Sequence, residues 1–366
     1  MTLRPTRTGW TLMTLAALAV GTGFWAGSRP LAVLGQALAL TLAALAWLAR
    51  SGARQVRLSR RHPSWAFEDE QVPVRLTVTN GARLPLRWLE VEDQFPADRD
   101  ALKALCLSGP LKPGRPVEAA YAAPCRKRRG GYAVGPAAVR LRDPLGAFEA
   151  LAGVSGSSDL TVFPRTVPIA RFPIAGQARW DNVDTETIPK AGSSLNFSGT
   201  REYRQGDSLR FIHWGATAHT GKLIVKEFEL NVATEVSVFL DAHYFAVKGM
   251  GRETTFEYSI KAAASIARYA LARGSRVRLV CQGKTPLEFP LGAGEYHLLS
   301  ILKALTRAQP DGKEPLATGL KRGLGRLETC STVVLIFNSV TIDLKAYIEA
   351  IALLRARQIK LVVVLV

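Results

Sequence analysis

The pattern of hydrophobic and polar residues starts with two long apolar runs that carry no charge. The runs cover residues 11–26 (TLMTLAALAVGTGFWA) and 31–49 (LAVLGQALALTLAALAWLA). Each is close to the roughly 20 residues that cross about 30 Å of hydrocarbon. Trp10, Trp25 and Trp47 lie at the ends of these runs, where aromatic rings favour the headgroup level. The pattern predicts a transmembrane hairpin over residues 1–50. A cleaved signal peptide fits less well, because a second run follows the first without a convincing cleavage site.

Positive charges flank the two runs unevenly. Arg4 and Arg7 precede the first run, and Arg29 alone lies in the turn. A cluster follows the second run: Arg50, Arg54, Arg57, Arg60 and Arg61. Cytoplasmic segments carry an excess of Lys and Arg, so both ends of the hairpin are expected in the cytoplasm. This predicts a two-pass protein of the inner (plasma) membrane, with its soluble domains on the cytoplasmic side.

The next stretch, residues 51–165, alternates between apolar and polar positions in short segments. Residues 72–79 (VPVRLTVT) alternate before the turn signal Asn80-Gly81, and segments 86–95, 116–123 and 132–141 follow with Gly and Pro between them. No long helical period interrupts the stretch. Several short strands at this spacing predict an antiparallel β-sandwich over residues 51–165.

From residue 234 onward, apolar strands alternate with helical patterns. Strand patterns lie at 236–240, 276–281, 332–337 and 360–366, and helical patterns at 254–273, 296–307, 315–327 and 343–358. Continuous apolar strands separated by helices predict a parallel sheet covered on both faces, a Rossmann-like α/β domain over residues 234–366. The sequence stops on an apolar strand, so either the natural chain is longer or this strand closes the sheet.

The connector between these domains, residues 166–233, holds the densest polar segment (199–229, GTREYRQGDSLRFIHWGATAHTGKLIVKEFE). Its candidate partner-binding residues are Arg201, Glu202, Arg204, Asp207, Arg210 and Trp214. Asp207 is expected to cap a short helix that follows it. Two interpretations stay open: the charges form a network that fixes the chain path, or Arg201, Arg204 and Arg210 receive an acidic group of a partner.

Composition and motifs exclude several classes of function. The net charge of +18 suits an anionic membrane or a nucleic acid, and the arginines beside the second span explain part of it, so nucleic acid is not required. Segment 215–222 (GATAHTGK) has the wrong spacing for a phosphate loop, and the chain holds no CxxC, HExxH or GxSxG motif. The sequence therefore predicts no catalytic residue and no cofactor.

The connector resembles the signature of the domain of unknown function 58 family, a pattern like ReYrpGDdlRrIdWkasArtgkLlVKefe. Positions that match it include Arg201, Glu202, Tyr203, Arg204, Gly206, Asp207, Arg210, Ile212, Trp214, Gly221, Lys222, Leu223, Val225, Lys226 and Glu227. Residues 129–136 (RGGYAVGP) and 143–146 (DPLG) resemble two further family segments. Two positions depart from the pattern: His213 stands where Asp is usual, and His219 where Arg is usual.

The resemblance implies a von Willebrand factor A-like domain at the C-terminal end. It also implies partnership with a MoxR-type AAA+ ATPase and with transglutaminase-like membrane proteins. In metal-binding domains of that fold, an Asp-x-Ser-x-Ser loop follows the first strand. Here Asp241 keeps the first position, His243 and Phe245 replace the two Ser residues, and Asn338 stands where a second Asp is usual. Too few oxygen ligands remain for Mg²⁺, and the Phe245 ring is expected to crowd the loop, so no metal is expected.

Together these patterns predict a membrane-anchored interaction or scaffold protein that faces the cytoplasm. Two alternatives belong to other classes. A metal-dependent adhesion module is supported by Asp241 and opposed by His243, Phe245 and Asn338. A cytoplasmic hydrolase has no motif in its favour.

Overall fold

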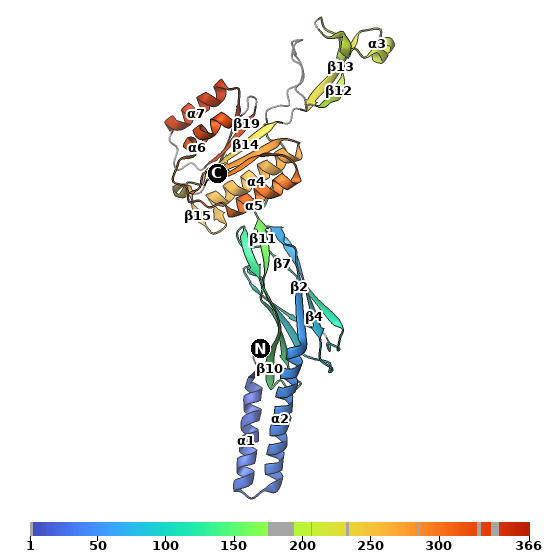
Figure 1. Ribbon diagram of the computed structural model, residues 1–366, viewed down its shortest axis with the longest axis vertical. Coiled ribbons are helices and arrows are strands. Elements are labelled where there is room, and N and C mark those ends of the chain that lie inside the picture. Colours follow the sequence, from blue (N-terminus) through green and yellow to red (C-terminus); the bar gives the residue numbers. More distant parts are fainter. Residues whose placement is uncertain are drawn as a thin grey trace. The chain divides into compact units, whose positions relative to one another are not determined.

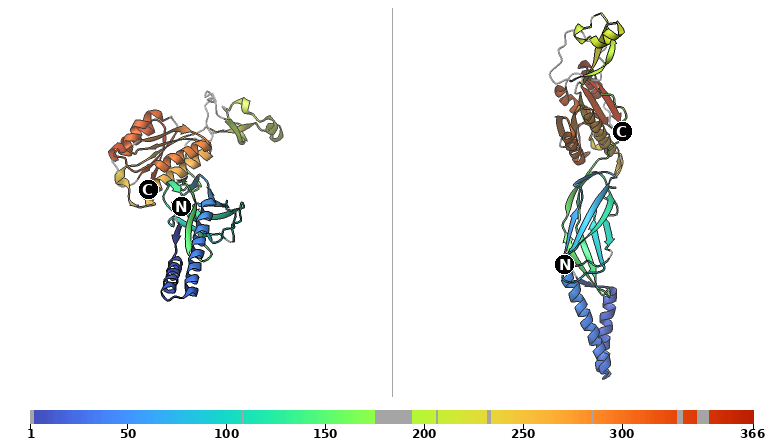
Figure 2. Two further views of the ribbon diagram at one scale, coloured as in Figure 1. Left: turned by 60° about the horizontal axis from the view of Figure 1, so that its bottom comes forward. Right: turned by 90° about the vertical axis from the view of Figure 1, so that its right-hand side faces the viewer.

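The chain is multidomain and combines helices with several sheets (Figure 1). The computed structural model describes residues 3–107, 109–174, 194–205, 207–231, 234–284, 286–327, 331–337 and 344–366. The chain divides into two compact units, Met1–Phe163 and Pro164–Val366. Each unit is described by itself below, and Figure 2 gives two further views of the ribbon.

Two helices, α1 (Arg7–Trp25) and α2 (Arg29–Gln55), form the hairpin at the start of the first unit. Buried residues recur in heptads along each helix: Gly9, Ala16 and Gly23 on α1, and Gly35, Leu42 and Ala49 on α2. Gly23 and Gly35 are the positions where the two helices approach each other. The small side chains bring the backbones close together: a Cβ atom on Gly35 would lie 2.7 Å from the backbone nitrogen of Val20.

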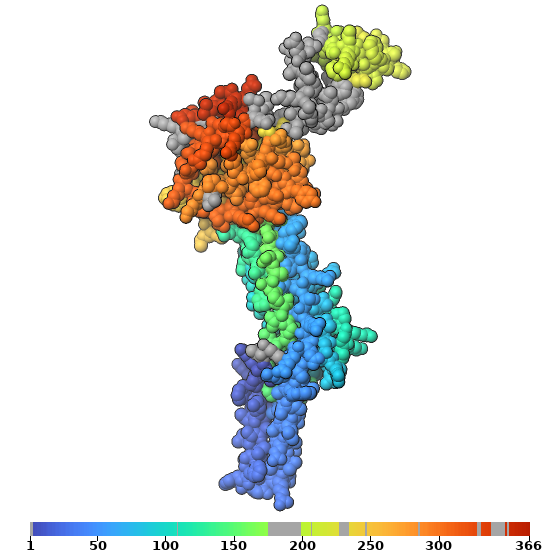
Figure 3. Space-filling view, in the orientation of Figure 1, coloured from blue at the N-terminus to red at the C-terminus, as the bar shows by residue number. Residues whose placement is uncertain are grey.

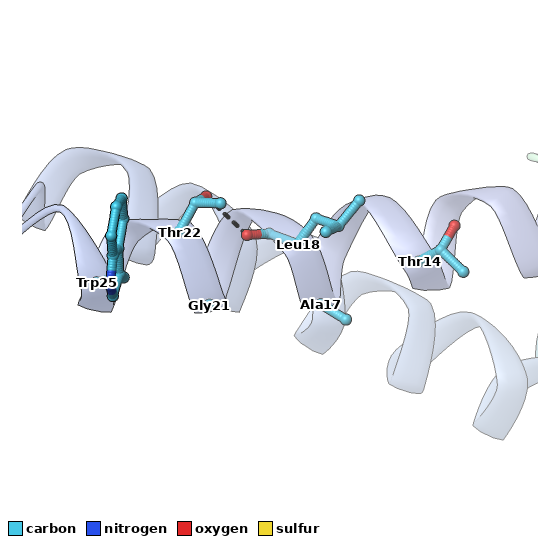
Figure 4. A pocket seen from close by; sticks show the side chains of 6 residues that line it. All are labelled: Thr14, Ala17, Leu18, Gly21, Thr22 and Trp25. Atoms are coloured by element: carbon cyan, nitrogen blue, oxygen red, sulfur yellow. Dashed lines mark hydrogen bonds between the residues drawn. The ribbon is translucent and has the colours of Figure 1, made fainter.

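The hairpin exposes many apolar side chains, and four of its threonine hydroxyls are satisfied within the helices. Among the described helices, α2 is the one that is long and apolar enough to cross a membrane by length and composition. Hydroxyl groups donate to carbonyls of the preceding turn at Thr11, Thr14, Thr22 and Thr41. Figure 4 shows the bond from Thr22 to Leu18 beside the open surface around Gly21 and Trp25. Such bonds leave no hydroxyl donor unpaired at these four positions.

Three sheets surround one core in the rest of the first unit. The first sheet has the order β1 (Leu3–Pro5), β10 (Phe148–Ser155), β9 (Ala137–Arg142), β5 (Leu89–Gln94) and β6 (Leu102–Cys106). The second has the order β2 (Val56–Arg61), β4 (Gln71–Asn80) and β7 (Pro116–Pro124). The third has the order β3 (Trp65–Phe67), β11 (Ser158–Phe163) and β8 (Gly130–Val134).

The alternation predicted over residues 72–79 is present in β4, where Val74, Leu76 and Val78 are fully buried. One pairing differs from the expected antiparallel arrangement, because β3 runs parallel to β11. Alternation specifies which face of a strand is buried and carries no information about strand direction. The hydrophobic pattern therefore could not predict that β3 and β11 run parallel.

Arg60 is buried, which corrects its assignment to the membrane-flanking cluster. Its guanidinium donates to the carboxylate of Asp93 at 2.7 Å and to the carbonyl of Val134 at 2.6 Å. The hydroxyl of Tyr121 donates to the other Asp93 oxygen at 2.8 Å. The charge pair thus joins β2, β5 and β7 inside the core, and Arg60 is not available to lipid.

The helical hairpin packs directly onto one end of the strands. The Thr6 hydroxyl donates to the carbonyl of Gly146 at 2.5 Å, and a Cβ atom on Gly9 would lie 2.0 Å from the carbonyl oxygen of Ala147. Leu42 of α2 packs with Ala147 and Phe148. Glycine at position 9 is therefore a condition for this close approach.

The second unit contains a five-stranded sheet with the order β18 (Leu287–Gly292), β17 (Arg276–Cys281), β14 (Glu235–Leu240), β19 (Thr332–Phe337) and β20 (Lys360–Leu365). The last four of these strands are parallel, as predicted, and β18 is an antiparallel edge strand that the pattern did not reveal. The helices α4 (Thr255–Ala272) and α5 (Glu295–Arg307) lie on one face of the sheet, and α6 (Leu316–Gly323) and α7 (Leu344–Ala356) on the other (Figure 1).

We predict that Gly9→Ala destabilises the first unit by about 2 kcal/mol, because the added methyl group meets a backbone carbonyl that cannot move aside. Burial raises the pKa of the Cys125 thiol to about 12, so this thiol reacts only after the strands separate. The temperature at which Cys125 becomes alkylated, read by peptide mass spectrometry in detergent, should fall in the variant.

Gly21→Ala is the matched control on the same helix, because no atom lies within 4 Å of the added Cβ atom. It should leave the alkylation midpoint unchanged or raise it, since Ala favours helix by up to about 1 kcal/mol over Gly. Equal effects of the two substitutions would show that the contact at Gly9 does not stabilise the unit.

Candidate functional site

The connector segment folds into a strand pair that carries a short helical insertion. Strand β12 (Ser194–Glu202) pairs antiparallel with β13 (Ile224–Asn231), with Arg201 opposite Val225. The insertion consists of the 3-10 helix η1 (Leu209–Phe211) and the helix α3 (Trp214–Thr220). Gly221 ends α3 in the left-handed conformation, with a φ of +68°, and returns the chain to β13.

A bidentate ion pair fixes the start of this insertion. The two terminal nitrogens of Arg201 donate to the two oxygens of Asp207, each at 2.7 Å. Asp207 also accepts a hydrogen bond from the backbone nitrogen of Arg204 at 2.8 Å, which closes the turn. The hydrogen bond from Arg201 is the main cause that lowers the pKa of Asp207. Asp207 therefore does not cap the following helix as expected, because its oxygens hold the turn that precedes η1.

His213 caps α3 in place of the Asp that is usual in the resembled family. Its Nδ1 accepts a hydrogen bond from the backbone nitrogen of Ala216 at 3.1 Å. An imidazole nitrogen accepts only when it carries no proton, so this cap needs the tautomer with a free Nδ1. The substitution thus preserves a side-chain acceptor at the start of the helix.

A second ion pair lies where the insertion leaves and rejoins the two strands. Lys222 donates to Glu202 at 2.8 Å, and both side chains are exposed, so the pair adds little stability. Ile212 and Val225 are both buried and form a backbone β-bridge that joins the insertion to β13. Of the six predicted residues, Arg201 and Asp207 are thus paired with each other, and Glu202 is paired with Lys222.

The remaining candidates are exposed residues of the turn and the insertion. Leu209 and Trp214 are 64% and 67% exposed, and Phe211 is also exposed. Arg204 and Arg210 are exposed, and neither makes an ion pair within the part of the chain that the structure describes. We call this set the connector surface: Arg204, Leu209, Arg210, Phe211 and Trp214. The sequence analysis missed Leu209 and Phe211. Both lie in a charged segment that is too short to form a core, and this was a sign that they are exposed.

Asp241 lies at the carboxyl end of β14, where the order of the strands reverses. The strands next to β14 are β17 on one side and β19 on the other, and such switch points are common ligand sites in open α/β sheets. Asp241 is buried, and its Oδ1 accepts a hydrogen bond from the backbone nitrogen of His243 at 3.0 Å. Burial raises the pKa of this carboxyl, and the hydrogen bond from His243 opposes that rise.

The rings that follow Asp241 stack on one another. The centroids of Tyr244 and Phe245 are 4.0 Å apart, and the His243 ring lies 5.3 Å from that of Tyr244. Phe245 is 63% exposed, and its ring lies against those of His243 and Tyr244 in the same loop. The expectation that this ring crowds a metal site stays a prediction. Among the described residues, no three His, Cys, Asp or Glu side chains are grouped to hold a metal. Asn338 lies outside the described residues, and the absence of a metal stays a prediction.

Comparisons with known proteins support the resemblance over part of the chain. Residues 199–364 match the family described as protein of unknown function DUF58. The uncharacterized protein YeaD of Bacillus subtilis (strain 168) is 24% identical over 262 residues, which make up 70% of this chain. The chain spans 63% of the length of that relative.

The solved structures with detectable similarity are remote. The CARDB domain of a Pyrococcus furiosus protein, in complex with di-metal ions, is 12% identical, with a TM-score of 0.22 over 29% of this chain and 86% of that one. The C-terminal domain of Wzt is 11% identical, with a TM-score of 0.24 over 38% of this chain and 86% of that one. Similarity at this level assigns neither a fold nor a function.

We predict that Asp207→Asn loosens the insertion, because it removes the charge from a pair held by two hydrogen bonds. Loss of about 1 kcal/mol should raise amide exchange in residues 203–214 about fivefold, measured by hydrogen–deuterium exchange on the full chain in detergent. The folded pKa of Asp207 is lowered, so the contribution is complete above the unfolded value of about 3.9 and is lost as pH falls through the folded value.

Glu202→Gln is the control, since it removes the exposed pair with Lys222 by the same change of acid to amide. Exchange in residues 203–214 should match that of the parent chain. If Asp207→Asn also leaves exchange unchanged, the bidentate pair does not hold the insertion.

Proposed function

We propose that this chain is a membrane-anchored docking protein that faces the cytoplasm and binds a partner protein through the connector surface. The observation that carries the proposal is the exposure of Trp214 and Leu209 beside Arg204 and Arg210. Trp and Arg are enriched among the residues that dominate binding at protein interfaces. An exposed face of this composition therefore favours a protein partner.

The contacts beneath this surface prepare it for binding. The pair of Arg201 with Asp207, the His213 cap and the bridge between Ile212 and Val225 stabilise the insertion. A surface that is already ordered loses less conformational entropy when a partner binds. The two interpretations of the connector are thus compatible. The paired charges fix the path of the chain, and the exposed residues on that path can bind a partner.

The proposed anchor consists of both α1 and α2 crossing the membrane. Many large apolar side chains on these helices are exposed, among them Leu18, Phe24, Leu34 and Leu40. Such a surface suits lipid, and the four satisfied threonine hydroxyls suit a medium without water. The excess of arginine after α2, against one arginine in the turn, favours a cytoplasmic location for the remaining domains.

The resemblance to the DUF58 family makes a MoxR-type AAA+ ATPase our first candidate partner, and a transglutaminase-like membrane protein the second. The family match over residues 199–364 includes the whole connector surface. We further propose that the α/β sheet is a von Willebrand factor A-like domain that serves as a docking platform without a metal. The replacement of two hydroxyl ligands by His243 and Phe245 supports this part of the proposal.

We predict that Arg204→Glu and Trp214→Ala each weaken binding of a purified MoxR-type ATPase from the same organism at least about tenfold. Charge reversal opposes an acidic partner group, and the Trp substitution removes exposed contact area. Both variants should melt within about 2 °C of the parent, because exposed substitutions rarely change stability. Affinity can be measured by biolayer interferometry on the detergent-solubilised full chain.

Arg307→Glu is the control for charge, because Arg307 is an exposed arginine at the end of α5 in the same unit. Its affinity for the ATPase should equal that of the parent. Unchanged affinity in both connector variants would contradict docking at this surface, and early melting of Arg204→Glu would instead assign Arg204 a structural role.

A further inference from the structure

The loops at one end of the strands in the first unit all lie beside the helical hairpin. Strand β1 ends at Pro5 just before α1, and β2 begins at Val56 directly after α2. The strand register places three further loops at this same end: residues 81–88 between β4 and β5, residues 109–115 before β7, and residues 143–147 between β9 and β10. Figures 1 and 3 show the blue helical hairpin and the strands that adjoin it.

Direct contacts fix the level of these loops along the helices. Gly146 accepts a hydrogen bond from Thr6, one turn before the exposed ring of Trp10. Leu86 lies against α2, because a Cβ atom on Gly52 would approach its side chain to 2.7 Å. The exposed ring of Trp47 lies just over one turn before Gly52. The loops are thus level with the end of the hairpin where its apolar surface stops.

These loops expose large apolar side chains among cations. Leu84, Trp88 and Leu145 are 59%, 54% and 52% exposed. Trp88 has a φ of +53°, a conformation that bulky residues rarely adopt. The exposed cations of the loops and the adjoining helix are Arg83, Arg87, Lys112, Arg115, Arg50 and Arg54. The acid in these loops, Asp143, is buried, and its carboxylate accepts hydrogen bonds from the backbone nitrogens of Leu145 and Phe148.

We infer that these three loops form a membrane-contact rim that binds anionic phospholipid headgroups and inserts Leu84, Trp88 and Leu145 into the interface. The inference rests on the proposed anchoring, since helices that cross the bilayer bring its surface to the loops around them. Trp side chains favour the headgroup level, and arginine pairs with phosphate through two parallel hydrogen bonds. The rim would orient the strands on the membrane.

The test uses the full chain in phosphatidylcholine vesicles with about 30% phosphatidylglycerol, matching an anionic leaflet. Cys106 and Cys330 are replaced by Ser, and a bimane probe is attached at Leu84→Cys. Leu102→Cys is the matched control, because Leu102 is similarly exposed but lies at the start of β6, at the opposite end of the strands. Lipids that carry a nitroxide near the headgroup should quench the probe at position 84 at least about threefold more than at position 102.

A second variant tests the role of the cations. Arg83→Glu with Arg87→Glu should reduce quenching at position 84 at least about twofold, and vesicles of phosphatidylcholine alone should do the same to the parent chain. If the chain floats with the vesicles and resists alkaline extraction, yet position 84 is quenched no more than position 102, the rim is wrong and the anchor stands. If alkaline carbonate releases the chain, the anchor itself is wrong, and the rim fails with it.

Discussion

The close approach of α1 to the turn before β10 is the contact on which the first unit depends. Gly9 allows the helix backbone to lie against the Ala147 carbonyl, and Thr6 donates to Gly146 next to it. Because α2 leads without a loop into β2, the two helices and the strands share one junction. In a membrane-anchored chain, this junction would transmit the orientation of the helices to the strands, and it places the proposed rim at the lipid surface.

A different constraint organises the second unit. The β12–β13 pair gains its order locally, from the bidentate pair of Arg201 with Asp207 and from the small contact of Ile212 with Val225. Such a module needs no large core, so it can expose Trp214 and Leu209 without losing its conformation. The five-stranded sheet has the opposite character, since every residue of β14 is buried and the strand ends at the buried carboxyl of Asp241.

Much of the architecture could be predicted from local patterns, and the exceptions share a physical cause. Alternation identified β4, and apolar runs identified β14 and β19, because burial of one or both faces of a strand determines which of its positions are apolar. Three features depend on partners far away in the sequence, so the local pattern did not predict them: the pairing of β1 with β10, the parallel pairing of β3 with β11, and the burial of Arg60 against Asp93. In the connector, opposite charges predicted a network, but which acid pairs with which cation followed only from the turn geometry.

The most direct test of the central claim, a two-span anchor with its soluble domains in the cytoplasm, is thiol accessibility in spheroplasts. The full chain with Ser28→Cys carries one thiol in the turn between α1 and α2 and retains the exposed Cys106 at the end of β6. A membrane-impermeant maleimide should label position 28 in intact spheroplasts and Cys106 only after permeabilisation, as read by peptide mass spectrometry. Labelling of Cys106 in intact spheroplasts, with position 28 protected, would contradict the account.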